Sequence, residues 1–117
     1  MHGSFSRADT WTFMAARGPD FRERYVDELP ASNADVGMTV AKLLDLNLPG
    51  RGTLRGRVLA EALRTEVPVE SPPAAVRRIE SAPDPRHGLK TILEEQVLGD
   101  HTYYDAAGFA GRTMGLE

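Results

Sequence analysis

Cysteine, long apolar runs and an excess of basic residues are all missing from the sequence, and each absence excludes a class of protein or site. Without cysteine, the chain can form neither disulfide bridges nor thiolate metal sites. No apolar run approaches the roughly 18 residues that a membrane-spanning helix requires. Acidic residues outnumber basic ones, 17 to 14, whereas a nucleic-acid-binding domain usually carries a basic stripe. We therefore expect neither a membrane nor a nucleic acid as a partner.

Large apolar residues are also scarce. Leu, Ile, Val and Phe together make up 26 of the 117 residues, which is only slightly more than the ~20% below which chains tend towards disorder. A chain this short also buries a smaller fraction of its surface than a larger domain does. The composition therefore predicts either a loosely folded chain or a chain that belongs to something larger.

One helix is predicted clearly, over residues 34–45. Ser32 and Asn33 are good N-cap residues, because their side-chain oxygens can accept a hydrogen bond from a free backbone N–H. Asp35 lies in the first turn, where negative charge suits the helix dipole. Apolar residues recur on one face at i, i+4, i+7 and i+8, and we expect this stripe to face the core: Val36, Val40, Leu43 and Leu44.

The rest of the chain is expected to be a mixture of strands, turns and one further short helix. β-prone segments are bounded by glycine and proline, and Gly99-Asp100 is typical of a tight hairpin turn. In chain order we expect strands over 10–16 and 21–26, a short helix over 58–63, an extended proline-rich linker over 67–73, a strand over 74–80, and a β-hairpin with arms 89–97 and 101–105.

Candidate catalytic groups are few when each is considered alone. His2, His87 and His101 lie too far apart to form a familiar metal-binding spacing, and a lone histidine near a terminus is usually solvated. The serines lie outside any G-x-S-x-G elbow. Arg7 and Asp9 are expected to form a surface ion pair of little energetic value.

The order of several weak motifs is more informative than any one of them. His2-Gly3-Ser4 is followed by AARGPDF at 15–21, NADVGMTVAKLLDL at 33–46, GTLRGRVL at 52–59 and YYDAAGFAGRT at 103–113. This ordered set resembles the C-terminal part of the alkaline phosphatase superfamily. The resemblance is greatest to type I phosphodiesterases and nucleotide pyrophosphatases, and to bacterial alkaline-phosphatase-like and sulfatase-like hydrolases.

The resemblance implies an α/β fold. The chain would be the C-terminal portion of an alkaline-phosphatase-like α/β/α sandwich, incomplete, with a C-terminal β-hairpin. Residues 1–66 would form the C-terminal segment of the hydrolase-like core, 67–73 a linker, and 74–117 the last strand and the hairpin.

The chemistry that the resemblance implies is hydrolysis of a phosphoester, or a sulfoester, with two divalent metals, commonly zinc. In this family the histidine of a late His-Gly segment is the last metal ligand, and here that position is His2. The resemblance assigns no other metal ligand, catalytic residue or cofactor-binding residue in this chain.

The nucleophile and the remaining ligands of such enzymes lie upstream of the His-Gly segment. A catalytic zinc typically takes three protein ligands, so we expect the isolated chain to bind no metal tightly and to be inactive. Met1 would then be an internal methionine, or the gene would be split and the missing N-terminal half would be a partner.

A second hypothesis stays open, in which the chain is a non-catalytic binding or interaction module. Its hairpin and apolar helix would then pack on a separately encoded partner. The substrate and the compartment also stay open. Family members often work in the periplasm or outside the cell, but the first residues show no basic segment followed by an apolar one, which a secretory signal would have.

Overall fold

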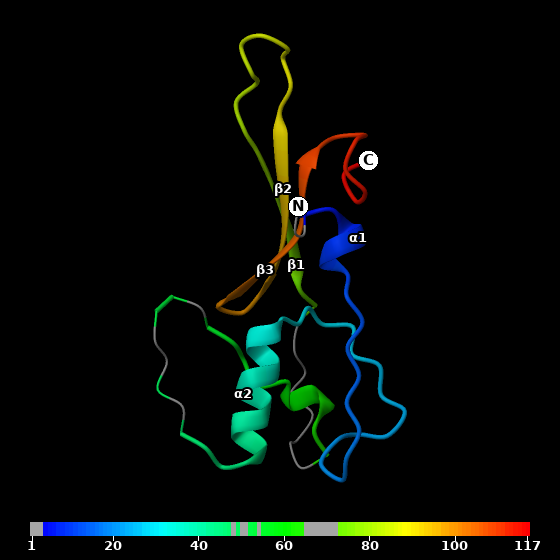
Figure 1. Ribbon diagram of the computed structural model, residues 1–117, viewed down its shortest axis with the longest axis vertical. Coiled ribbons are helices and arrows are strands. Elements are labelled where there is room, and N and C mark those ends of the chain that lie inside the picture. The colour runs from blue at the N-terminus through cyan, green and yellow to red at the C-terminus, as the bar shows by residue number, and fades with distance from the viewer. Residues whose placement is uncertain (1–3, 48, 50–51, 54, 65–72) are drawn as a thin grey trace. The chain divides into compact units, whose positions relative to one another are not determined.

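The structure is a computed structural model that describes residues 4–47, 49, 52–53, 55–64 and 73–117 (Figure 1). It contains helices and one three-stranded antiparallel sheet, so the mixed α/β character predicted from the sequence is confirmed. The elements are α1 Arg7–Thr10, α2 Asn33–Leu43, the 3₁₀ helix η1 Ala60–Ala62, β1 Ala75–Glu80, β2 Thr91–Leu98 and β3 His101–Phe109.

The chain forms two compact units, which we describe separately. The sheet unit contains Met1–Met14 and Ala74–Glu117, and the helix unit contains Ala15–Pro73. This grouping differs from the sequence-based division, because the residues up to Met14 group with the C-terminal sheet. Residues 67–72 of the expected linker lie outside the described part of the chain.

The sheet has the strand order β1-β2-β3, with both pairs antiparallel. The predicted strand over 74–80 and the predicted hairpin are confirmed. Gly99 adopts φ 57° in the turn between β2 and β3, a left-handed conformation that glycine tolerates without strain. β3 continues past the expected end at Asp105, because Ala106 and Ala107 still pair with β2 across a bulge.

A small core lies on one face of this sheet. Ile92, Ala106 and Leu116 form the buried apolar cluster, and Leu116 comes from the chain end that folds back after β3. The backbone N–H of Gly111 donates to the carbonyl of Leu116 at 2.8 Å and closes this return. The core of the sheet unit therefore depends on residues beyond the hairpin.

The strand predicted over 10–16 is wrong. The structure has α1 instead, with Ser6 as its N-cap, followed by residues without regular structure. The N-terminal segment is held to β3 and to the chain end by backbone hydrogen bonds. Ala107 N–H donates to Phe5 at 2.7 Å, and Arg7 N–H donates to Met114 at 3.0 Å. Tertiary hydrogen bonds thus override the local β propensity.

The predicted helix in the second unit is confirmed as α2, and Ser32 with Asp35 forms the capping box that starts it. The predicted orientation of its apolar stripe is wrong. Val36 and Val40 are exposed by 38% and 47%, and Leu44 at the C-cap by 62%, whereas Asp35, Thr39 and Ala41 are buried. The buried polar side chains of Asp35 and Thr39 are satisfied by hydrogen bonds.

The remaining predictions in this unit are met only in part. The helix expected over 58–63 is the single 3₁₀ turn η1. The strand expected over 21–26 is wrong, because only Phe21 forms a bridge, with Leu63, and Arg24 has a left-handed φ of 56°. Within the described residues, no helix has the length and apolar character needed to cross a bilayer.

Candidate functional site

The histidines do not form a metal centre in the described part of the chain. His2, which the resemblance assigns to a metal, lies outside the described residues. His87 has its Nδ1 2.8 Å from Oδ2 of Asp84, in the connection after β1. Among the described residues, no three His, Asp or Glu side chains gather as a metal-binding group.

Arg7 is the centre of a polar cluster in the sheet unit. Its Nη2 donates to Oδ2 of Asp105 at 2.9 Å and to Oε2 of Glu94 at 3.1 Å. The predicted pairing of Arg7 with Asp9 is wrong, because Asp9 accepts instead from the hydroxyl of Ser4. The sequence contains no local signal for the observed pairing, since Arg7 and Asp105 are separated by 98 residues.

The carboxylate of Asp105 is 6% exposed and uses both of its oxygens. Its Oδ1 accepts from the indole Nε1 of Trp11 at 2.8 Å, and the guanidinium of Arg7 lies 5.3 Å from the centre of the Trp11 ring. The hydrogen bond from Arg7 to Asp105 is the main cause that raises the pKa of Arg7, and burial opposes it. A cluster in which one guanidinium bonds to two carboxylates suits fastening α1 to the sheet.

A second polar cluster fastens α2 within the helix unit. The carboxylate of Asp35 is fully buried, and its Oδ2 accepts from the backbone N–H of Ser32 at 2.7 Å. Its Oδ1 accepts from the backbone N–H of Arg57, also at 2.7 Å. One turn further along α2, the hydroxyl of Thr39 donates to the carbonyl of Asp35 and accepts from the N–H of Leu59. The buried face of α2 is therefore joined to the segment before η1 by hydrogen bonds.

Asp27, in the stretch of chain before α2, has a raised pKa. Burial is the largest cause, the backbone N–H of Leu29 opposes it, and the nearby carboxylate of Glu61 adds to it. Arg57 balances part of this negative charge, with its Nη1 2.6 Å from a carboxylate oxygen of Glu61. Raised carboxyl pKa values occur at active sites and in structural networks alike.

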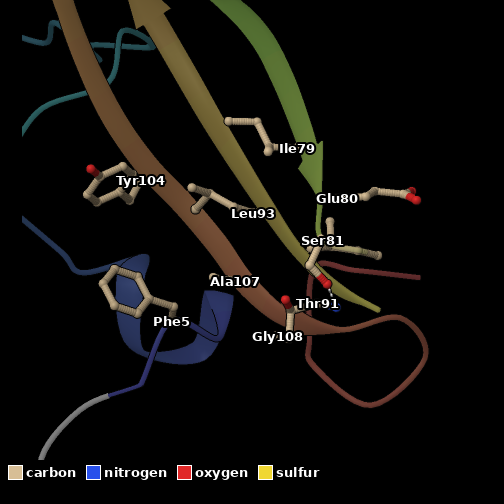
Figure 2. A pocket seen from close by; sticks show the side chains of 10 residues that line it. Phe5, Ile79, Glu80, Ser81, Thr91, Leu93, Tyr104, Ala107 and Gly108 are labelled. Carbon is tan, nitrogen blue, oxygen red and sulfur yellow. Dashed lines mark hydrogen bonds between the residues drawn. The ribbon is translucent and has the colours of Figure 1, made fainter. Parts of the chain in front are cut away.

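An open apolar groove lies against the sheet, and its lining includes Ile92 of the core (Figure 2). It has a volume of about 550 Å³. The rings of Phe5 and Tyr104 meet edge to face with their centres 6.0 Å apart, and Leu93 and Ile79 continue the apolar row across the strands. Ser81, Thr91 and Glu80 supply polar groups at one end.

The groove was not predicted from the sequence. One face of the sheet carries Ile79, Leu93 and Ala107, because these residues lie opposite one another in the strand register. Side chains alternate between the two faces of a strand, so this shared face could be predicted once the register is known. Phe5 has no such signal, since it reaches the groove through the backbone hydrogen bond from Ala107. The groove offers an apolar floor with few hydrogen-bonding groups, which suits an apolar partner surface better than a polar substrate.

Comparison with protein-family models, curated proteins and solved structures finds no match to this chain.

Proposed function

We propose that the chain is the C-terminal part of a metal-dependent phosphoester hydrolase built on an alkaline-phosphatase-like α/β/α sandwich, and that it has no catalytic activity by itself. The ordered motifs from His2 to Thr113 support the family. In this proposal His2 supplies its imidazole to one metal, and the nucleophile and the other ligands come from the segment that precedes it. When bound, the metals of such an enzyme would supply activation of a Thr or Ser nucleophile and charge stabilisation for the phosphoryl oxygens.

The observation that carries the proposal is the amount of large apolar surface left exposed in both units. Trp11, Phe13 and Met14 are exposed by 68%, 93% and 49% in consecutive or neighbouring positions. On α2, the stripe Val36–Val40–Leu44 is exposed over two turns. Soluble monomers rarely leave contiguous apolar patches open, whereas a segment of a larger sandwich exposes the surfaces that the missing layers would cover.

The test is hydrolysis of bis(p-nitrophenyl) phosphate with added zinc. We expect no turnover by the 117-residue chain, and zinc-dependent turnover once the chain is expressed together with the coding segment that precedes His2. In that longer protein, His2→Ala is expected to abolish turnover. His87→Ala is the matched control and is expected to retain it, because His87 is exposed and paired with Asp84.

Two results would contradict the proposal. One is zinc-dependent turnover by the 117-residue chain alone, because a single histidine from the family motif cannot hold two metals. The other is an equal effect of His2→Ala and His87→Ala in the longer protein.

The sheet groove favours the second candidate function, a non-catalytic interaction module. Its apolar floor of Ile79, Leu93 and Ala107 is open in a chain that contains no other strand to cover it among the described residues. Unfolding of the whole 117-residue chain in one cooperative transition would support this candidate, because a fragment that lacks most of its sandwich is expected to unfold unit by unit.

A further inference from the structure

β1 is an edge strand whose side chains are all exposed. In the sheet order β1-β2-β3 it pairs on one side only, with β2. Among the described residues, no backbone hydrogen bond joins the other side of β1 to another segment. Proteins usually protect such edges, because a row of free N–H and C=O groups can pair with another strand.

The direction of the backbone groups decides which residues of β1 can make new hydrogen bonds. Ser81 N–H donates to Thr91 at 2.9 Å, and Ile79 lies opposite Leu93 in the same register. In an antiparallel pair, residues two apart point their N–H and C=O groups the same way. Arg77, Ile79 and Ser81 therefore point towards β2. Arg78 and Glu80 point outwards, as does Val76.

These outward groups fit a second copy of the same strand in a small number of registers. Two antiparallel edges can bond only where outward residues face outward residues, so an even-numbered residue must lie opposite an even-numbered one. With Arg78 opposite Arg78 of the other copy, two like charges meet directly, which is destabilising. With Val76 opposite Arg78 of the other copy, Arg77 lies opposite Arg77 of the other copy at the two-fold axis. This register again places two like charges together.

One register instead pairs opposite charges. When Ile79 lies opposite Ile79 of the second copy, Arg78 of each copy lies opposite Glu80 of the other. The segment Arg78-Ile79-Glu80 is thus complementary in charge to itself. Each of the two Arg78–Glu80 pairs also exchanges its backbone hydrogen bonds, since both residues point outwards.

We propose that two copies of this chain associate by antiparallel pairing of their β1 strands about a two-fold axis at Ile79, with Arg78 of each copy opposite Glu80 of the other. Such an interface uses the same patch on both copies and closes on itself. It doubles the sheet to six strands in continuous order. Arg78 keeps donors for Glu94, from which its Nη1 lies 3.0 Å, because a guanidinium has five N–H groups.

The register also joins the apolar faces of the two copies. Ile79, Leu93 and Ala107 lie across one face of each sheet, so the central Ile79 pair links the two rows into one. The strand is short, and we expect a dimer that forms in the micromolar range and dissociates on dilution, as small interfaces do.

The first test uses charge exchange, read by sedimentation velocity over a range of protein concentrations. Arg78→Glu alone and Glu80→Arg alone each place like charges opposite one another, so each is expected to be monomeric. An equimolar mixture of the two variants restores opposite charges in the mixed dimer only, and is expected to dimerise. Arg86→Glu is the matched control: it changes the same charge outside β1 and is expected to dimerise like the parent chain.

The second test measures the register and does not depend on the charge variants. The chain has no cysteine, so a single introduced thiol can be oxidised only to an intermolecular disulfide. Ile79→Cys is expected to give a disulfide-linked dimer quickly, because residue 79 lies opposite itself. Val76→Cys and Arg78→Cys are expected to link much more slowly, at a rate set by random collision.

The outcomes separate this inference from the proposed function. A parent chain that stays monomeric at all concentrations would overturn the dimer and leave the hydrolase proposal untouched. The same conclusion would follow if Ile79→Cys formed disulfide-linked dimers no faster than Val76→Cys. Faster linking of Arg78→Cys would overturn the register. Failure of the mixed charge variants to associate, when each is folded by circular dichroism, would overturn the role of Arg78 and Glu80.

Discussion

Asp35 and Arg57 are joined by a hydrogen bond of 2.7 Å from the backbone N–H of Arg57 to a fully buried carboxylate oxygen. The other oxygen of Asp35 completes the capping box with Ser32. A single side chain therefore both starts α2 and holds the segment that leads to η1.

The first prediction follows from this double role. Asp35→Ala leaves the N–H groups of Ser32 and Arg57 without their acceptor, and we expect a loss of about 2–4 kcal/mol in the free energy of unfolding. Urea unfolding followed by circular dichroism at the helix band measures it. Asp20→Ala, at an exposed position of the same unit, is expected to change the free energy by less than about 0.5 kcal/mol. Equal effects of the two substitutions would contradict the role of Asp35.

Two glycines of the helix unit are predicted to respond in opposite directions to alanine. A Cβ at Gly56 would lie 2.3 Å from the carbonyl oxygen of Ala34 and 2.9 Å from the backbone nitrogen of Asp35. Because these neighbours are backbone atoms, Gly56→Ala is expected to destabilise the unit by about 1–3 kcal/mol. Gly37 lies in α2 with open space around its Cβ position, so Gly37→Ala is expected to stabilise by about 0.5–1 kcal/mol.

The same urea experiment measures both glycine variants. A stabilising Gly56→Ala would mean that the segment before η1 does not approach α2 as closely as the structure has it. A destabilising Gly37→Ala would mean that the exposed face of α2 is covered in solution.

Removing Arg7 is predicted to loosen the sheet unit. Arg7→Ala leaves the buried carboxylate of Asp105 without its cation, and we expect a loss of about 2–3 kcal/mol. Trp11 is the only tryptophan and bonds to the same carboxylate, so its fluorescence reports the transition. Arg112→Ala, at an exposed position of the same unit, is the control and is expected to unfold like the parent chain. If the unfolding transition reported by Trp11 fluorescence were unchanged in Arg7→Ala, the proposed stabilising role of the cluster around Arg7 would be contradicted.

The pH dependence of the helix unit is predicted from Asp27. Its pKa is raised mainly by burial, so the folded state binds the proton more tightly than the unfolded chain does. This group therefore opposes folding increasingly as the pH rises above the ordinary Asp value of about 3.9. Asp27→Asn stays neutral and can still accept from Leu29.

We expect Asp27→Asn to have a higher urea midpoint than the parent chain at pH 7, with the difference disappearing below pH ~4, where Asp27 is protonated in both states. Glu28→Gln, at the exposed neighbouring position, is expected to show no such dependence. A lower midpoint for Asp27→Asn at pH 7 would mean that its negative charge stabilises the fold.

The elements that were predicted correctly depend on contacts between near neighbours in the chain. The capping residues Ser32 and Asp35 lie three positions apart, and the tight turn at Gly99-Asp100 joins adjacent strands. Capping boxes and tight turns of this kind can be predicted from the sequence, because the residues that form them are close together in the chain. It was sufficient for α2, for β1 and for the hairpin.

The features that were missed depend on partners far along the chain. Residues 10–16 were predicted as a strand, yet α1 forms and Trp11 bonds to Asp105, 94 residues away. The stripe of α2 was expected to be buried, but the buried face is polar because Arg57 and Leu59 supply its hydrogen bonds. The apolar periodicity of a sequence shows where a helix lies. It does not show which face of that helix is buried when few apolar side chains are available to cover it. The proposed role of His2 rests on the resemblance and stays a prediction.

The measurement that tests the central proposal most directly is the DNA sequence immediately upstream of codon 1, read in the same frame. We expect an open frame that encodes a Thr or Ser nucleophile and dispersed Asp and His ligands, with which His2 would complete a two-metal site. In-frame stop codons directly upstream, with no such segment encoded nearby, would contradict it. His2 would then be an ordinary solvated side chain, and the chain would be a separate interaction module.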